Sequence, residues 1–219
     1  MEIKYEPARP LTEAAEMRPQ APLPANEVKR LQTLLNYRVL DTLPEATYDE
    51  ITTTAARICN TPIALISLID IGRQWFKSKV GIATTQTPRD HAFCAHTILQ
   101  GEVMLVSDTW QDQRFAHNPL TTGAPHIRFY AGAPLISEAG FALGSLCVID
   151  TQPRQLAVSQ ICALRQLATD TVNHLERRLL TQQMKQEASQ PYADPYELQQ
   201  MVTHWKYLTR TGIRSYVRA

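Results

Sequence analysis

The run of residues 62–70 constrains the fold of this chain more than any other segment. It reads Pro-Ile-Ala-Leu-Ile-Ser-Leu-Ile-Asp, a short apolar run rich in β-branched side chains. Such a run is typical of a central strand that is covered on both faces. Residues 71–73 have turn character, and residues 74–80 alternate better between apolar and polar, which predicts a hairpin partner. We therefore expect a sheet with other elements packed on both sides.

The remaining periodic segments predict the order of elements around this hairpin. Apolar residues at helical spacing predict one helix that begins after Asn26, as its N-cap, and a second over residues 45–59. Residues 81–90 are expected to form a loop. A short helix, a short strand and a further strand pair complete the domain: residues 91–100, 103–106, 127–136 and 141–149. Helices grouped beside antiparallel hairpins define the α+β fold class.

A long helix is predicted over residues 159–185. Its apolar face is formed by Ile161, Leu164, Leu167, Ala168, Val172, Leu175 and Leu179. A helix of this length spans roughly 40 Å, which exceeds what a single sheet covers. We expect its far end to pair with a second copy as a short coiled coil, giving a homodimer. A frayed, exposed helix end is the alternative.

The chain is expected to have three parts. Residues 1–25 contain five prolines and no sustained apolar period, which predicts an extended or mobile segment. Residues 26–185 form the domain with its flanking helices. Residues 186–219 contain an amphipathic helix over 195–209, which we expect to pack on the domain or a partner, and a basic end with Arg210, Arg214 and Arg218.

Composition narrows the functional classes. Lys and Arg total 22 and Asp and Glu 21, so the net charge of +1 argues against nucleic-acid binding. The N-terminus lacks a signal-peptide pattern and no apolar stretch approaches the ~20 residues of a membrane span, which favours a cytoplasmic protein. No cysteine pair has CxxC spacing, so we expect buried free thiols. The cysteines are Cys59, Cys94, Cys147 and Cys162.

Six stretches carry a more specific pattern. They are LDTLPE at 40–45, PIALISLID at 62–70, RQWFKS at 73–78, PRDHAFCAH at 88–96, RFYAGAPL at 128–135 and LGSLCVID at 143–150. In this order they resemble the GAF domain of bacterial signalling proteins. The resemblance implies a twisted antiparallel sheet of five or six strands with helices on both sides. It also implies a ligand pocket on one face of the sheet and dimerisation through terminal helices.

The segment 108–123 is the best pocket candidate, because it has no steady period and is long for a connection. With its neighbours it offers charge, aromatic rings and hydrogen bonds around one apolar site. The candidate ligand-binding residues are Phe93, Cys94, Asp108, Trp110, Arg114, Phe115, His117, Asn118, Arg128 and Tyr130.

A structural lid is the alternative for this segment. In that case Arg114 pairs with Asp112 or Asp108, while Trp110 and Phe115 cover the sheet. Strand alternation sends Tyr130 and its neighbour Phe129 to opposite faces, so at most one of them lines the pocket.

The segment 88–96 offers little chemistry beyond packing. His91 and Cys94 share a helix face but His96 points elsewhere, and no further ligand has suggestive spacing, so no metal site is expected. Cys94 is expected to be a packed thiol. Arg89 is expected to pair with Asp90 or another acid rather than to bind an anion.

These features favour a non-enzymatic sensory or regulatory module that signals through dimer helix packing to an effector such as a histidine kinase or a cyclase. Its ligand stays unknown. Residues 121–126 lack a cysteine, which argues against covalent bilin attachment. One alternative is a thiol enzyme of the free methionine sulfoxide reductase type that uses Cys94 or Cys147, although the four cysteines do not reproduce that family's arrangement. The other is a dimerisation module whose pocket Phe93, Trp110 and Phe115 fill.

Overall fold

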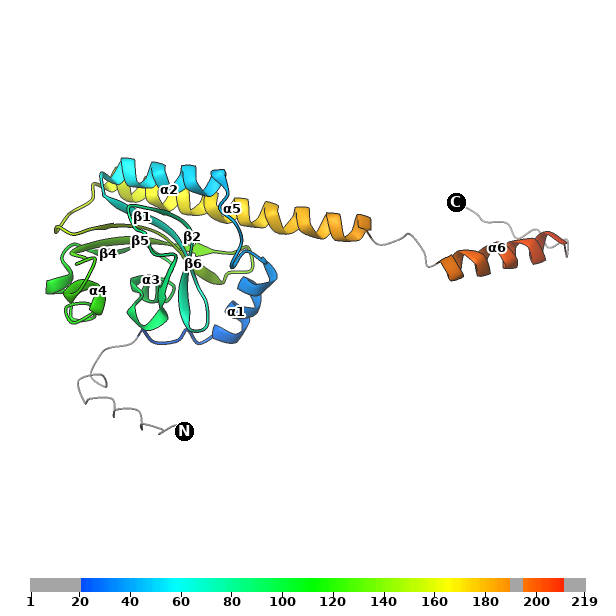
Figure 1. The fold of residues 1–219 in the computed structure, drawn as a ribbon, viewed down its shortest axis with the longest axis horizontal. Coiled ribbons are helices and arrows are strands. Elements are labelled where there is room, and N and C mark those ends of the chain that lie inside the picture. Colours follow the sequence, from blue (N-terminus) through cyan, green and yellow to red (C-terminus); the bar gives the residue numbers. More distant parts are fainter. Residues whose placement is uncertain (1–20, 190–194, 211–219) are drawn as a thin grey trace, which may run out of the picture. The chain divides into compact units, whose positions relative to one another are not determined.

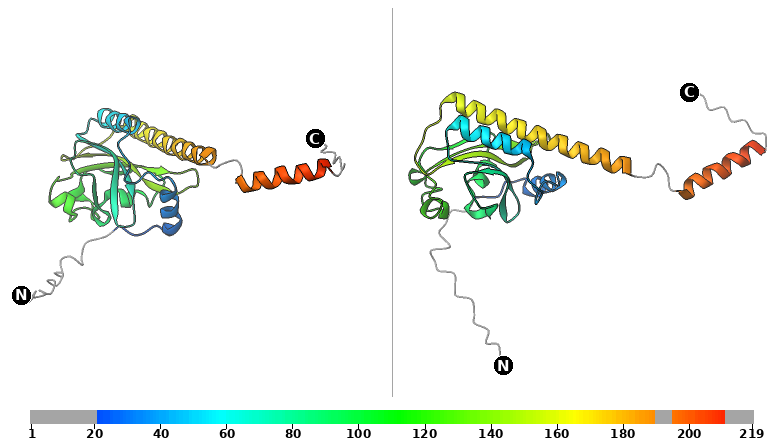
Figure 2. Two further views of the ribbon diagram at one scale, coloured as in Figure 1. Left: turned by 45° about the vertical axis from the view of Figure 1, so that its right-hand side comes forward. Right: turned by 45° about the horizontal axis from the view of Figure 1, so that its top comes forward.

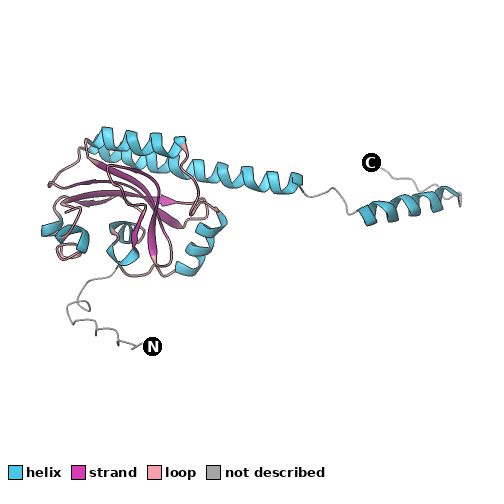
Figure 3. Cartoon of the chain, viewed as in Figure 1, coloured by secondary structure: helices cyan, strands magenta, loops and turns pink. Residues whose placement is uncertain are grey.

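The computed structural model describes residues 21–189 and 195–210. The chain divides into two compact units, residues 1–177 and 178–219. The first is an α+β domain, as the secondary structure in Figure 3 shows. Most of the predicted proline-rich segment 1–25, together with Arg214 and Arg218 of the basic end, lies outside the described residues.

The domain is built on one six-stranded antiparallel sheet with the order β3-β2-β1-β6-β5-β4. All seven residues of β1 are buried, so the central strand and its hairpin partner are confirmed. β3 is new, because three residues are too few to show alternation, and it lies within the expected loop 81–90. The strands are β1 (Ile63–Ile69), β2 (Arg73–Val80), β3 (Gln86–Pro88), β4 (Met104–Val106), β5 (Phe129–Ile136) and β6 (Ala142–Asp150).

Helices cover both faces of this sheet, which confirms the predicted architecture (Figures 1 and 2). The helix α2 and the first part of α5 lie over one face, called here the α2 face, and the short helices α3 and α4 lie over the other, the α3 face. The helices are α1 (Glu27–Asn36), α2 (Ala46–Cys59), α3 (Phe93–Thr97), α4 (Pro119–Thr122), α5 (Val158–Ser189) and α6 (Pro195–Arg210).

Two helix starts differ from the sequence prediction. Asn26 is the residue before α1, but its side chain makes no capping hydrogen bond. The expected helix 91–100 is a 3-10 turn (Arg89–His91) followed by α3, because Ala92 between them has extended backbone angles (φ −79°, ψ 119°). The long helix and the helix from Pro195 are confirmed as α5 and α6.

A buried ionic cluster fixes α1 against the sheet ends. Both carboxylate oxygens of Glu27 accept hydrogen bonds from Arg30, at 2.7 and 2.9 Å, and Arg89 donates to the same carboxylate at 2.5 Å. Arg30 also donates to the Ile69 carbonyl at 2.7 Å. Burial raises the pKa of Glu27, but its hydrogen bonds with both guanidinium groups outweigh this effect and lower the pKa. Arg89 therefore pairs with an acid, as expected, and that acid is Glu27 rather than Asp90.

Candidate functional site

A polar cluster lies in the centre of the otherwise apolar α3 face. Tyr130 on β5 extends its ring over Gly132 two residues along the strand, where a Cβ atom would stand only 2.2 Å from the Tyr130 hydroxyl oxygen. Glycine therefore makes room for this ring. The Tyr130 hydroxyl lies 2.6 Å from the Thr97 hydroxyl of α3 and 3.3 Å from the Ser145 hydroxyl of β6. The cluster thus joins the helix layer to two strands.

Two thiols complete this cluster. The Sγ atoms of Cys94 on α3 and Cys147 on β6 are 3.7 Å apart, and both residues are at most 1% exposed. The Tyr130 hydroxyl donates to Cys94 Sγ at 3.3 Å. Burial would raise the pKa of Cys94, but hydrogen bonds from its neighbours, Cys147 first, outweigh burial and lower it. Burial raises the pKa of Cys147, and the Cys94 thiol beside it raises it further.

A small cavity of about 30 Å³ adjoins the cluster. This is room for one or two water-sized groups. Gln74 Oε1 and Thr87 Oγ1, from the lining, are buried and have no hydrogen-bond partner, and Gln74 is 5% exposed. Buried polar atoms are almost always paired, so these two point to a polar occupant. The lining is Ile63, Leu65, Gln74, Phe76, Ile82, Thr87, Phe93, Cys94, Leu120, Pro125, Ile127, Tyr130 and Ile149.

Stacked aromatic rings explain why so little space remains on this face. The rings of Phe93 and Phe115 stack with centroids 4.1 Å apart, and Phe93 also packs on Tyr130 at 5.3 Å. His96 meets the Phe115 ring edge-on at 4.9 Å. Burial, and secondarily the Arg114 charge, lower the pKa of His96 to about 4. The imidazole is therefore neutral near pH 7.

The segment 108–123 is held by contacts within itself and by contacts with neighbouring residues. Asp108 forms a two-pronged ion pair with Arg128, at 2.9 and 2.8 Å, and Arg114 pairs with Asp112 at 2.6 Å. Asn118 caps α4 by accepting from the Leu120 amide, and its side-chain amide donates to the His91 carbonyl. These contacts hold the segment in place as a cover.

Three of the ten candidate residues line the cavity, namely Phe93, Cys94 and Tyr130. Phe115 is fully buried and stacks on Phe93, whereas Trp110 is 49% exposed. His117 is also exposed. The other four, Asp108, Arg114, Asn118 and Arg128, make the contacts just described.

Sequence reasoning missed four polar residues near the cavity, Thr97, Ser145, Gln74 and Thr87, and named Cys147 only as a thiol of the enzyme alternative. Thr97, Ser145 and Cys147 belong to the cluster around Tyr130, and Gln74 and Thr87 line the cavity from β2 and β3. A signal was present for the strand residues, because polar side chains within apolar runs, such as Ser67 and Ser145, share one face of the sheet. Ser67 and Ser145 are direct partners in the register of β1 and β6.

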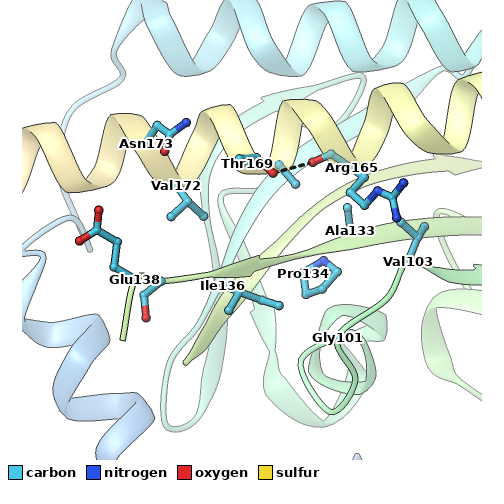
Figure 4. A pocket seen from close by; sticks show the side chains of 12 residues that line it. Gly101, Val103, Ala133, Pro134, Ile136, Glu138, Arg165, Thr169, Val172 and Asn173 are labelled. Carbon is cyan, nitrogen blue, oxygen red and sulfur yellow. Dashed lines mark hydrogen bonds between the residues drawn. The ribbon is translucent and has the colours of Figure 1, made fainter. Parts of the chain in front are cut away.

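A larger groove of about 340 Å³ lies between β5 and α5 (Figure 4). Ala133, Pro134 and Ile136 form its β5 wall, and Arg165 extends across its α5 wall. Arg165 pairs with Glu102 at 3.7 Å, with both side chains exposed, so this ion pair adds little stability. Thr169 donates to the Arg165 carbonyl within the helix, at 3.2 Å.

Comparison with known proteins identifies the class. The GAF domain model matches residues 43–175, so the chain belongs to the GAF family. A cyclic di-GMP phosphodiesterase of Pseudomonas aeruginosa is 43% identical over 148 residues, which are 67% of this chain. The match spans only 25% of that relative's length.

Solved structures agree on the fold. The PixJ GAF domain of Thermosynechococcus elongatus, in its blue-light-absorbing form, has a TM-score of 0.55 at 13% identity and covers 77% of this chain and 100% of that one. The GAF domain of an Acinetobacter phosphoenolpyruvate-protein phosphotransferase has a TM-score of 0.50 at 13% identity, covering 71% and 96%.

Two further findings concern residues 21–189 and 195–210. No group of three or more His, Cys, Asp and Glu side chains among them could hold a metal ion. Within the same ranges, no helix combines the length and the apolar character that crossing a membrane requires.

Proposed function

We propose that this GAF domain is a non-enzymatic regulatory module that senses a small polar species at the α3 face and passes the response through β5 to α5. The observation that carries this proposal is the position of β5. This strand places Tyr130 in the polar cluster on one face and Ala133, on the other face, in the wall of the α5 groove. A displaced Tyr130 ring would thus shift the strand that forms one wall of the α5 groove.

The phosphodiesterase relative supports a regulatory role. Three quarters of that protein lie outside the match, so the part shared with this chain accompanies other regions there. We propose by analogy that this module controls an effector. The activity in the relative's name belongs to the relative.

We propose that α5 carries the response to a second copy of the chain. Among residues 158–186 of α5, the buried ones all lie between Leu164 and Leu175. Farther along the helix, Leu180 and Met184 are 58% and 69% exposed and stand four residues apart, on one helix face. Exposed apolar pairs at this spacing suit a coiled-coil seam.

A native mass spectrum of the full chain tests this proposal. We expect a dimer, and a doubly substituted Leu180→Glu, Met184→Glu chain that is monomeric, while Gln183→Glu, an exposed residue of the same helix segment, stays dimeric. A wild-type monomer at all concentrations would contradict the α5 proposal. A dimer that never retains a small molecule and responds to none would instead favour a module that only dimerises.

A further inference from the structure

The thiols of the α3 face are not explained by packing alone. Apolar side chains of similar size would fill the same space without a polar network. Instead, Cys94 and Cys147 are in sulfur contact, and Tyr130 and Ser145 hydroxyls gather around them. The buried Ser67 hydroxyl of β1 lies on the same face, beside Ser145, which is its partner in the register of β1 and β6. Hydrogen bonds donated by such hydroxyl groups stabilise negative charge on sulfur.

We propose that Cys94 and Cys147 form a peroxide-reactive dithiol that closes to an intramolecular disulfide. The two sulfur atoms need to approach by less than 2 Å from their 3.7 Å separation to reach disulfide bonding distance of about 2 Å. Cys94 stands on a five-residue helix in the cover of the sheet, and Cys147 on a strand in its middle. The bond would therefore fasten the cover to the sheet.

The adjoining cavity provides a place for the oxidant. Its volume of about 30 Å³ suits a molecule of two oxygen atoms, and Cys94 is part of its wall. The unpartnered oxygens of Gln74 and Thr87 accept hydrogen bonds, and hydrogen peroxide donates two. A large ligand does not fit this volume.

The reaction balances with hydrogen peroxide as the oxidant. The Cys94 thiolate sulfur attacks one peroxide oxygen, so that an S–O bond forms and the O–O bond breaks. The departing hydroxide takes up the proton that Cys94 released and becomes water. The Cys147 sulfur then attacks the Cys94 sulfur, an S–S bond forms, the S–O bond breaks, and the second hydroxide takes the Cys147 proton. Two thiols and one peroxide give one disulfide and two waters.

The surroundings of the two thiols decide which one attacks the peroxide and which one then attacks the oxidised sulfur. Cys94 receives the hydrogen bond from Tyr130 and lies at the cavity, so it is the attacking thiol. Its neighbours lower the pKa of Cys94, which raises the share of thiolate. Cys147 keeps its proton until the second step, since burial raises its pKa. Cys59 takes no part, because it stands at the end of α2, on the other face of the sheet.

Peroxide treatment of the reduced full chain tests the proposal. After quenching with an alkylating reagent and digestion without reductant, mass spectrometry should find the Cys94-to-Cys147 linked peptide while the exposed Cys162 is still alkylated. A Cys59→Ser, Cys162→Ser control should form the same link. The Cys147→Ser chain should stop at a sulfenic acid on Cys94, captured by dimedone, and Tyr130→Phe should slow the first step about tenfold.

The proposal would be overturned if peroxide oxidised Cys162 while Cys94 and Cys147 were still free thiols that the quench alkylates. Disulfide links from Cys94 or Cys147 to Cys59 or Cys162 would overturn it as well. Because the wild-type chain is measured directly, an unfolded variant cannot hide the result. The test reads sulfur chemistry and not oligomeric state, so its failure leaves the proposed regulatory function standing.

Discussion

The two faces of the sheet bury their strands in different ways. On the α2 face, β1 presents Ala64, Ile66 and Leu68, all essentially without exposure, to long helices. On the α3 face, short helices cover thiols, hydroxyls, an amide and a small cavity. Neighbouring residues of β5 show the contrast most directly, because Phe129 faces one side and Tyr130 the other. The α2 face holds the apolar packing that stabilises the domain. The α3 face holds the polar groups that can respond to a ligand.

Phe129→Ala should cause the largest loss of stability if the apolar packing on the α2 face stabilises the domain. Removing this fully buried ring leaves a void between packed layers, and we expect the free energy of unfolding to fall by about 4 kcal/mol. Ile136→Ala on the same strand, where the side chain is 40% exposed, should cost less than about 1 kcal/mol. Urea unfolding followed by circular dichroism measures both. Equal losses of unfolding free energy in the two variants would contradict this role of the α2 face.

Gly132→Ala should disrupt the packing of side chains on the α3 face. The added Cβ would collide with the buried Tyr130 ring, so we expect a loss of about 2–3 kcal/mol together with a displaced ring. Gly101→Ala is the matched control, since no atom lies within 4 Å of its added Cβ. Thermal unfolding of both chains gives the comparison. A stable Gly132→Ala chain would show that the ring has room to move.

Tyr130→Phe should be milder, since it removes only the hydroxyl. The Thr97, Cys94 and Ser145 side chains lose a shared partner in a buried place. We expect the free energy of unfolding to fall by about 1.5 kcal/mol in urea unfolding. A neutral result would mean that these groups find other partners.

The smallest expected effect is the pH dependence from His96. Its pKa in the folded chain is about 4 and in the unfolded chain about 6.5. Between these values the unfolded state binds the extra proton, so stability falls as pH decreases from about 6.5 to 4 and this loss is complete below 4. Because the ring is partly exposed, we expect about 1 kcal/mol at pH 5. The His96→Gln chain should lack this part of the pH profile.

The fold was largely predictable from local patterns. The run at β1, its hairpin partner and the long helix have strong periodicity, and the structure confirms all three. β3 and the break at Ala92 were not predictable, because three-residue pairings and single backbone angles leave no periodic signal. The acid that pairs with Arg89 could not be named either, since Glu27 stands 62 residues away in sequence.

The site was less predictable than the fold. Alternation correctly separated Phe129 from Tyr130, and the candidates Phe93, Cys94 and Tyr130 line the cavity. The Cys94–Cys147 contact depends on how a short helix lies over the sheet, which no spacing in the sequence encodes. Charged residues of the segment 108–123 suggested a ligand, but Asp108 and Arg128 satisfy one another.

Hydrogen exchange in α5 tests the central claim most directly, namely that β5 couples the α3 face to this helix. The wild-type and Tyr130→Phe chains are compared at amides 164–175 of α5 and 51–59 of α2. We predict that exchange accelerates more in α5 than in α2, because β5 forms the wall of the α5 groove while α2 packs on β1 and β2. Equal acceleration in both helices, or none in α5, would contradict the account.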